Sequence, residues 1–348
     1  RRPSKIFAML IFREGKSFSA FSSRSFTFSK ILSIFLALAG SFKGIDGFEL
    51  SQYLHFKQAR KIGNNLKMSE NKADESCNYE NEKIFLVTGS TDGIGKHTSQ
   101  KLAETGARVI IHGRNPTRCE ETVAWLQSTT GNDKIDHFVA DLSEMRNVKA
   151  LAEQISQTYP HLDCLINNAG VFEEDFQVTP DGMEMTFAVN VAAPFVLTQR
   201  LLPLLQKKPG SRLIVVSSIS QGWSIDMENL QYQNGGFSAH SSYSLSKLCD
   251  AMIAFEMAER FGSESLTVNT LDPGTVNTKM LQAGWGMCGI SVSRANNEFW
   301  LATSPDVAGV NGKYFVSCRE TSASQVAYDK EVRQQLWEYL ENITGVSF

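Results

Sequence analysis

The sequence has few cysteines and histidines, and neither type forms a recognisable ligand pattern. The cysteines contain no C-x-x-C pair: Cys77, Cys119, Cys164, Cys249, Cys288 and Cys318. The histidines show no H-E-x-x-H or similar spacing: His55, His97, His112, His137, His161 and His240. Scattered residues of these types predict free thiols in a reducing compartment and no metal site.

Long apolar runs and an excess of basic charge in the main body are also missing. The apolar segment 31–39 is far short of the ~20 residues that a membrane-spanning helix needs, so we expect no transmembrane helix. Residues 1–67 carry 12 Lys and Arg against 3 Asp and Glu, which divides the net charge of -3 into +9 there and -12 in residues 68–348. An acidic body predicts no nucleic-acid partner.

The first 67 residues are rich in Phe and Ser and poor in acids. Such a leader is typical of a transit peptide or a signal peptide. A third interpretation is translated untranslated message, because the chain begins with Arg1 and Met68 opens an ordinary polar tail. A start at Met68 predicts a cytoplasmic protein, whereas a genuine leader predicts an organelle, chloroplast or mitochondrion. Residues 1–81 are expected to be this leader or a non-native extension, largely disordered.

From residue 82 onward, short apolar runs alternate with longer amphipathic stretches. The runs lack polar alternation, as expected for strands covered by helices on both faces. This order predicts βαβ units and a single α/β domain over residues 82–348. Seven parallel strands are expected at Ile84 to Thr88, Arg108 to His112, Ile135 to Val139, Cys164 to Asn167, Arg212 to Ser217, Leu266 to Leu271 and Lys313 to Val316.

The intervening stretches predict helices. Apolar residues recur at spacings of three and four from Ser143 to Tyr159, behind a serine cap. Further helices are expected at about Met183 to Leu205, Ser242 to Phe261 and Asp329 to Asn342.

The loop TGSTDGIGK, residues 88–96, follows the first predicted strand and has the composition of a phosphate-binding turn. Five residues separate Gly89 from Gly95 and His97 follows Lys96, so the loop fails the triphosphate pattern at two points. Strand, glycine turn and helix together fit a dinucleotide pyrophosphate. A plain strand-to-helix turn stays open as the alternative, and Lys96 is interpreted as a first-turn helix residue.

The end of the second strand indicates which dinucleotide is bound. NAD-binding domains place an Asp or Glu there for the ribose hydroxyls, but this sequence reads VIIHGRN, with Gly113 and Arg114. A guanidinium can pair with a 2'-phosphate where a carboxylate would repel it. The sequence therefore predicts NADP(H), with a plain surface charge as the alternative role of Arg114.

Tyr243 and Lys247 stand four residues apart in SSYSLSK, on one face of a predicted helix. A phenol with a pKa near ~10 is a poor acid-base catalyst, and a nearby ammonium lowers that pKa. Alone, the pair could be an ordinary solvated face.

Together with five further motifs, the loop and the pair resemble the short-chain dehydrogenase/reductase family over nearly all of residues 82–340. The others are Asp141-Leu142, NNAG at residues 167–170, Asn190 in FAVNV, Ser218 in VVSSIS and DPGTVNT at residues 272–278. The resemblance implies a Rossmann-type three-layer α/β/α sandwich with a seven-stranded parallel sheet, binding a dinucleotide for catalysis.

The resemblance also implies roles for particular residues. Tyr243 would be the general acid or base, Ser218 would polarise the carbonyl oxygen, Lys247 would hold the nicotinamide ribose and lower the Tyr243 pKa, and Asn190 would position a water. Ser217 is the less favoured partner of the serine pair. The implied cofactor contacts are Gly89, Ser90, Thr91, Gly93, Ile94, Gly95, Arg114, Asn115, Asp141, Leu142, Asn168, Ala169, Gly170, Tyr243, Lys247, Pro273, Gly274, Val276 and Thr278.

The 24 residues between Ser218 and Tyr243 contain MENLQ. This segment resembles the branch with retinol dehydrogenases, WW-domain oxidoreductases and protochlorophyllide reductase relatives. The stretch after Thr278 corresponds to the family's substrate lid, where Met280, Trp285 and Met287 would give an apolar lining; ordinary packing is the alternative. Family members often pair through the helices that carry the active site, so a homodimer is one expectation.

The leading hypothesis is an NADP(H)-dependent oxidoreductase that reduces a carbonyl, or oxidises the matching alcohol, of a lipophilic small molecule. A catalytically silent NADP(H)-binding scaffold or regulator is the alternative. Substrate identity, stereochemistry and direction are not readable from the sequence.

Overall fold

The computed structural model describes residues 79–348. The expectations for the leader, for a start at Met68 and for the location that follows from either lie outside these residues.

An eight-stranded sheet forms the centre of the described chain, in the order β3-β2-β1-β4-β5-β6-β7-β8. The strands are β1 (Ile84–Val87), β2 (Arg108–Gly113), β3 (Ile135–Val139), β4 (Cys164–Asn167), β5 (Ser211–Val216), β6 (Leu266–Asp272), β7 (Tyr314–Val316) and β8 (Arg319–Thr321). The first seven are parallel, and their ends differ from the predicted ones by at most one residue. The predicted α/β sandwich is confirmed.

The eighth strand corrects the predicted count. β8 pairs antiparallel with β7, and Val316 faces Arg319 across a two-residue turn. Ser317 and Cys318 both have positive φ, at 50° and 61°, which is the backbone of a type I′ hairpin. This turn usually contains Asn and Gly, so the sequence Ser-Cys gave no hairpin signal.

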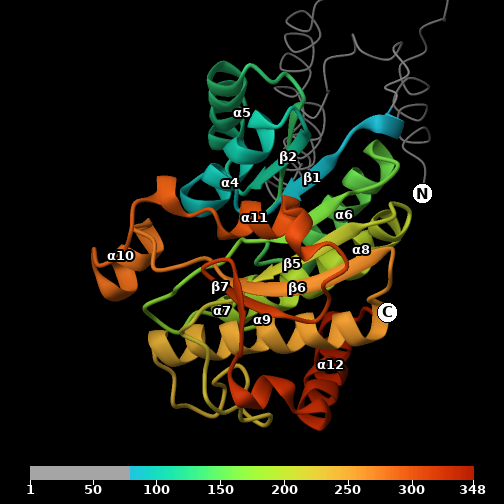
Figure 1. The fold of residues 1–348 in the computed structure, drawn as a ribbon. Helices are drawn as coiled ribbons and strands as arrows, with labels where there is room; N and C mark the ends of the chain where they lie inside the picture. The colour runs from blue at the N-terminus through green and yellow to red at the C-terminus, as the bar shows by residue number, and fades with distance from the viewer. Residues whose placement is uncertain (1–78) are drawn as a thin grey trace, which may run out of the picture. The chain divides into compact units, whose positions relative to one another are not determined.

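Helices cover both faces of the sheet (Figure 1). They are α4 (Gly93–Glu104), α5 (Pro116–Thr130), α6 (Met145–Thr158), α7 (Met185–Phe187), α8 (Ala193–Gln206), α9 (Ala239–Phe261), α10 (Lys279–Trp285), α11 (Asn297–Thr303) and α12 (Lys330–Thr344). Alternate residues of β1 enter different cores: Phe85 and Val87 pack with α4, α5 and α11, whereas Ile84 and Leu86 pack with α6, α8 and α9. This two-sided burial explains the fully apolar strands.

Two helices differ in detail from the prediction. The serine cap before α6 is wrong: Glu144 occupies the N-cap position without a capping bond, and the Ser143 N–H instead donates to Asp141 Oδ1. The helix expected from Met183 contains a π-helical turn, Ala188–Ala192, between α7 and α8. Within the described residues, Met185–Gln206 is long and apolar enough to span a membrane, but 78% of its most apolar window is buried inside the protein, as in a core helix.

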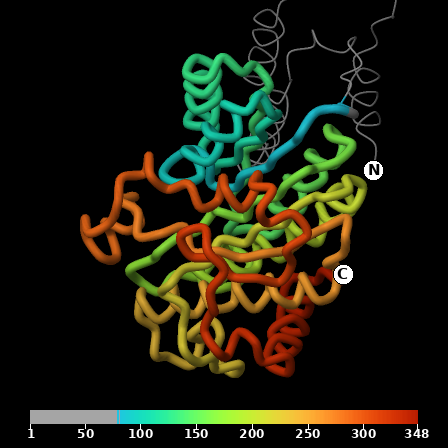
Figure 2. The backbone as a smooth tube through the Cα atoms, viewed as in Figure 1, coloured from blue at the N-terminus to red at the C-terminus, as the bar shows by residue number. Residues whose placement is uncertain are grey.

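The strand order reverses between β1 and β4, because β2 and β3 extend the sheet one way and β5 to β8 the other. Ligands of open parallel sheets bind beside such a reversal, outside the carboxyl ends of the strands. After β6 the chain runs away from the sheet in a segment that contains α10 and is orange in Figure 2. It returns where Val276 forms a bridge with Ile290.

Candidate active site

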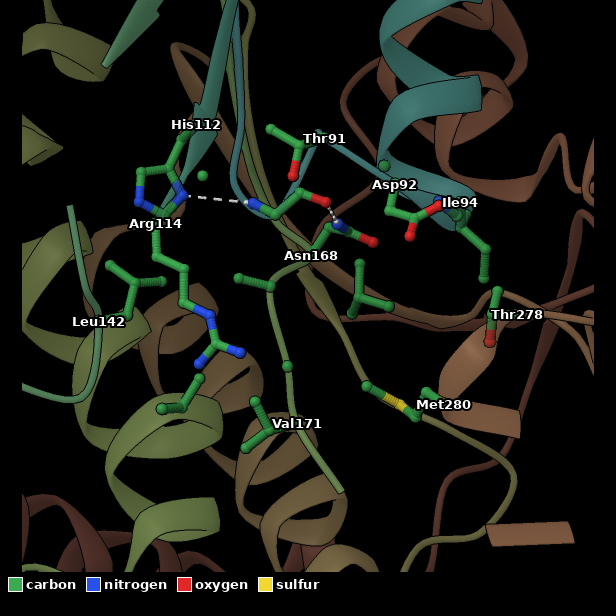
Figure 3. A pocket seen from close by; sticks show the side chains of 18 of the residues that line it. Thr91, Asp92, Ile94, His112, Arg114, Leu142, Asn168, Val171, Thr278 and Met280 are labelled. Atoms are coloured by element: carbon green, nitrogen blue, oxygen red, sulfur yellow. Dashed lines mark hydrogen bonds between the residues drawn. The ribbon is translucent and has the colours of Figure 1, made fainter. Parts of the chain in front are cut away.

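A pocket of about 510 Å³ lies at the carboxyl ends of the strands, at this reversal. It brings together the glycine loop, the ends of β2, β3 and β4, helix α9 and the chain after β6. Figure 3 labels side chains from the loop, from the ends of these three strands and from the chain after β6. Most of the predicted cofactor contacts line it: Gly89, Thr91, Gly93, Ile94, Gly95, Arg114, Asn115, Asp141, Leu142, Asn168, Ala169, Gly170, Tyr243, Lys247, Pro273 and Thr278. Ser90, Gly274 and Val276 do not.

Hydrogen bonds hold the glycine loop against the chain at the end of β4. The Thr88 hydroxyl accepts the N–H groups of Asn168 and Ala169, each at 3.0 Å, and Asn168 Nδ2 donates to the Thr88 carbonyl at 2.6 Å. Gly89 has φ 65°, and a Cβ there would lie 2.8 Å from Ala169 Cα. Only glycine fits this approach. The bare backbone that results is the cradle a pyrophosphate requires.

Ser90 and His112 fix the loop from the other side. Ser90 is fully buried, where its hydroxyl donates to the Val87 carbonyl and accepts the His112 N–H, both at 2.8 Å. His112 Nδ1 accepts from Gly89 N–H at 3.3 Å, so Nε2 carries the proton and donates to the Ala140 carbonyl at 3.1 Å. Ser90 therefore supports the pocket from behind its lining.

The end of β2 has no room for an acidic side chain. A Cβ on Gly113 would lie 2.6 Å from Thr91 Cγ2 and 3.1 Å from Cys119 Sγ. Arg114 is exposed, lines the pocket and has no ion-pair partner among residues 79–348. Asn115 caps α5 by accepting the Arg118 N–H at 3.0 Å. At the end of β2 the pocket is thus bordered by the Arg114 guanidinium, and position 113 carries no acidic side chain.

Three charged residues at the pocket edge form a cluster that the sequence analysis missed. Asp92 Oδ2 accepts from Arg118 Nη2 at 2.9 Å and from Lys279 Nζ at 2.7 Å, and all three residues line the pocket. Arg118 lies in the first turn of α5, four residues after Arg114. Lys96 is absent from the lining, and its ammonium lies 4.2 Å from the centre of the Trp125 ring.

Tyr243 lies on the pocket wall, near the first turn of α9, where the Lys247 charge and the Ser218 hydroxyl both act to lower the pKa of its phenol. Ser217 lines the pocket and Ser218 does not, and the hydroxyl of the buried Ser217 donates to the Lys247 carbonyl at 2.6 Å. Burial raises the pKa of Tyr243 above its ordinary value, and the opposing charge of Lys247 does not cancel this effect. The phenol is therefore protonated at neutral pH.

The Lys247 ammonium is buried one turn along α9, with its nitrogen 5.8 Å from the centre of the Tyr243 ring. It donates to the Val216 carbonyl at 2.9 Å and to Asp250 Oδ2 at 2.8 Å. Because an ammonium has three N–H donors, one remains for the pocket. Asp250 was not identified from the sequence, although it follows Lys247 by three helical positions.

Asn190 lies in the π-helical turn and is buried, outside the pocket lining. Its Oδ1 accepts the Val171 N–H at 2.8 Å, and its Nδ2 donates to the Val171 carbonyl and to Ser246 Oγ, both at 3.0 Å. The amide thereby holds the chain after NNAG against α9. Turns of this kind often occur at functional sites.

Aromatic rings cover Tyr243 on the lid side. Trp285, at the end of α10, packs against Tyr243, Phe172 and His240, with ring centres 5.4, 5.0 and 5.0 Å away. Met280 lines the pocket, whereas Met287 is 67% exposed. Of the three expected lid residues, Trp285 therefore packs on Tyr243 without lining the pocket, Met280 lines it, and Met287 does neither; Phe172 is an addition.

The arrangement is a dinucleotide cradle with an acid-base tyrosine on its wall. The family profile described as short chain dehydrogenase matches residues 83–286. The chain belongs to this family. Retinol dehydrogenase 14 of Mus musculus is 35% identical over 289 residues, covering 76% of this chain and 86% of the relative. Polyprenol dehydrogenase of Homo sapiens is 31% identical over 284 residues, with coverages of 76% and 86%.

Solved structures of the family show the same fold. A short chain dehydrogenase from Shigella flexneri in complex with NADP has 28% identity and a TM-score of 0.57, covering 68% of this chain and 96% of its own. One from Escherichia coli in complex with NADPH has 28% identity and a TM-score of 0.56, with the same coverages. The predicted family, oxidoreductase class and nicotinamide type of cofactor are confirmed.

Several pocket residues were absent from the sequence prediction. They are Asp92, His112, Arg118, Ala140, Val171, Val189, Val216, Ser217 and Lys279. Most are apolar or lie next to a predicted residue, so only the fold shows that they face the pocket. Among residues 79–348, no three His, Cys, Asp or Glu side chains gather in a way that could hold a metal ion.

The buried imidazole of His112 predicts acid sensitivity of the fold. Burial lowers its pKa from 6.5 to about 4, although the Ala140 carbonyl and Asp141 oppose the change. The unfolded chain therefore binds a proton at a higher pH than the folded protein, and stability falls as the pH drops from about 6.5 to about 4. The loss amounts to about 3 kcal/mol at most.

His112→Gln retains a donor for Ala140 and removes this titration. We expect its Tm, measured by circular dichroism, to fall less steeply than that of the wild type as the pH is lowered through this window. Parallel Tm profiles for the two proteins would contradict the assignment.

Proposed function

We propose that the protein is an NADP(H)-dependent oxidoreductase that reduces the carbonyl group of a lipophilic small molecule or oxidises the matching alcohol. The observation that carries the proposal is the position of the Tyr243 phenol: it lies on the wall of the dinucleotide pocket, one helical turn from the buried Lys247 ammonium.

A bound nicotinamide would supply or accept the hydride. The chain's own residues then need to orient the carbonyl and provide a proton. Ser218 is suited to donate a hydrogen bond to the substrate oxygen while the Tyr243 O–H delivers the proton. Lys247 has one free N–H for a ribose hydroxyl, and its charge favours the phenolate that remains. Asn190 contributes by fixing the chain beside them.

The preference for NADP(H) rests on Arg114 and Gly113. A guanidinium that has no ion-pair partner among residues 79–348, next to a position too crowded for a carboxylate, favours a 2'-phosphate. Arg118 is close enough in the chain to add a second cation, although Asp92 holds it in this structure. Two solved relatives in complex with NADP and NADPH support the choice.

The substrate class rests on the lid. Trp285 and Phe172 form an aromatic wall beside Tyr243, and Met280 extends the apolar surface at the pocket. Such a wall favours apolar ligands. Relatives named for retinol and for polyprenol, both lipophilic alcohols, support this class.

Tyr243→Phe removes the proton donor but retains the ring that packs on Phe172 and Trp285. General acid catalysis contributes about 10²- to 10⁴-fold, so we expect kcat to fall by at least the lower figure. The Kd of NADPH, measured by fluorescence quenching, should be unchanged. Tyr232→Phe, outside the pocket lining, serves as the control and should turn over normally; a Tyr243 variant that retains activity would refute the role.

Arg114→Ala tests the cofactor preference. A hydrogen bond to a charged group contributes about 1.5–3 kcal/mol, so kcat/KM with NADPH should fall about 10- to 100-fold while that with NADH changes little. Arg200→Ala removes an exposed arginine on α8 as the control. Wild-type protein that uses NADH as efficiently as NADPH would contradict the proposal.

Trp285→Ala tests the substrate class. Loss of the apolar wall should lower kcat/KM for a long-chain isoprenoid aldehyde by about tenfold and leave a short-chain aldehyde nearly unaffected. Trp223→Ala is the control, because that ring is 89% exposed. The wild type should also prefer lipophilic aldehydes to sugars, and the reverse ranking counts against the proposal.

A further inference from the structure

Asp250 and Lys247 form a buried ion pair behind the reactive tyrosine. Their nitrogen and oxygen lie 2.8 Å apart, and the side chains are only 6% and 2% exposed. The two residues are one turn apart on α9, so the helix holds them together. The site therefore contains a carboxylate that none of the proposed steps uses.

The carboxylate opposes the effect of the ammonium on Tyr243. A lone ammonium would stabilise the phenolate, but an ammonium paired with a carboxylate forms a unit without net charge. Burial raises the pKa of Tyr243, Lys247 lowers it, and Asp250 raises it further. Burial alone would lower the pKa of Lys247, but the negative charge of Asp250 raises it above its ordinary value. The lysine thus stays charged while its influence on the phenol is reduced.

Other charged groups pack around α9, and two of them act on the site: Asp272 raises the pKa of Tyr243, and Glu298 raises that of Lys247. On β6, Asp272 accepts the N–H groups of Ile219 and Gly274. On α11, Glu298 Oε2 accepts from the Thr98 hydroxyl at 2.8 Å.

On α7, Glu184 accepts backbone N–H groups at the start of its own helix and the Ser242 hydroxyl. Farther along α9, Glu256 pairs with Arg260 and with Arg333 of α12. Within residues 79–348, Asp250 is therefore the only carboxylate in an ion pair with Lys247.

We propose that Asp250 is a positioning residue that holds the Lys247 ammonium in place behind Tyr243 and offsets its charge. This inference rests on the proposed function of Tyr243 as acid and base. A phenol that stays protonated well above neutral pH keeps a high fraction of the enzyme ready for carbonyl reduction. Alcohol oxidation, which needs the phenolate, is correspondingly confined to alkaline pH.

Burial raises the pKa of Asp250 to about 6, against the opposing charge of Lys247. The carboxylate is therefore ionised through the range in which Tyr243 would titrate, and its effect on the phenol is present there.

The test uses Asp250→Asn, which retains the shape of the side chain and removes its charge. With Lys247 uncompensated, the ionisation midpoint of Tyr243 should fall by about one pH unit. The midpoint is read from tyrosinate absorbance of the cofactor-free protein, as the difference between each protein and its Tyr243→Phe counterpart. The rising limb of alcohol oxidation and the falling limb of carbonyl reduction should move down with it.

Glu256→Gln is the matched control, because it removes another buried, ion-paired carboxylate from the same helix. It should leave the Tyr243 midpoint unchanged. If Asp250→Asn does not fold, Asp250→Ser removes the charge with a smaller side chain and should give the same downward shift. An unchanged or higher midpoint in the folded variant would overturn the proposal, as would an equal shift in Glu256→Gln.

The absorbance titration separates this inference from the proposed function. The titration needs no turnover. A wild-type protein that reduces no carbonyl would refute the proposed function, but the ionisation midpoint of Tyr243 could still be measured. Conversely, if the enzyme is active and its pH profile is the same in the wild type and in Asp250→Asn, the proposed function stands and the role of this carboxylate is refuted.

Discussion

The reversal of strand order between β1 and β4 determines where every reactive group can lie. Parallel strands end at one edge of the sheet, and at a reversal the loops that follow two neighbouring strands turn in opposite directions. Here the glycine loop follows β1 and NNAG follows β4, and the hydrogen bonds that the Asn168 and Ala169 N–H groups donate to the Thr88 hydroxyl join them. The pocket is the space beside this junction.

Burial then decides the chemistry of the groups at that edge. Ser217 and Ser218 are neighbours in the sequence, but the hydroxyl of Ser217 donates to the main chain of α9, whereas that of Ser218 acts to lower the pKa of Tyr243. Tyr243 and Lys247 are both removed from water, so their mutual charge interaction is weakly screened. A small change in the charge around Lys247 therefore has a large effect on the phenol.

Much of the fold could be predicted because parallel strands covered on both faces are apolar throughout. The seven strands between Ile84 and Val316 carry this signal, and the motifs indicated Tyr243, Lys247 and the glycine loop. The hairpin to β8 could not be predicted, because Ser317 and Cys318 adopt positive φ without the usual Asn or Gly. Asp250 was missed for another reason: an acid three positions after a lysine is usually a solvated helix pair.

The contrast between Asp92 and Asp250 shows why position matters more than residue type. Both carboxylates accept a hydrogen bond from a lysine that lines the pocket. Asp92 is exposed at the pocket edge, where water screens its contacts with Lys279 and Arg118 and where a phosphate could compete for the same cations. The side chain of Asp250 is buried beside Lys247, where solvent does not screen the ion pair. The contacts of the exposed carboxylate are therefore screened, whereas the buried one acts at short range on the charge of Lys247 and, through it, on Tyr243.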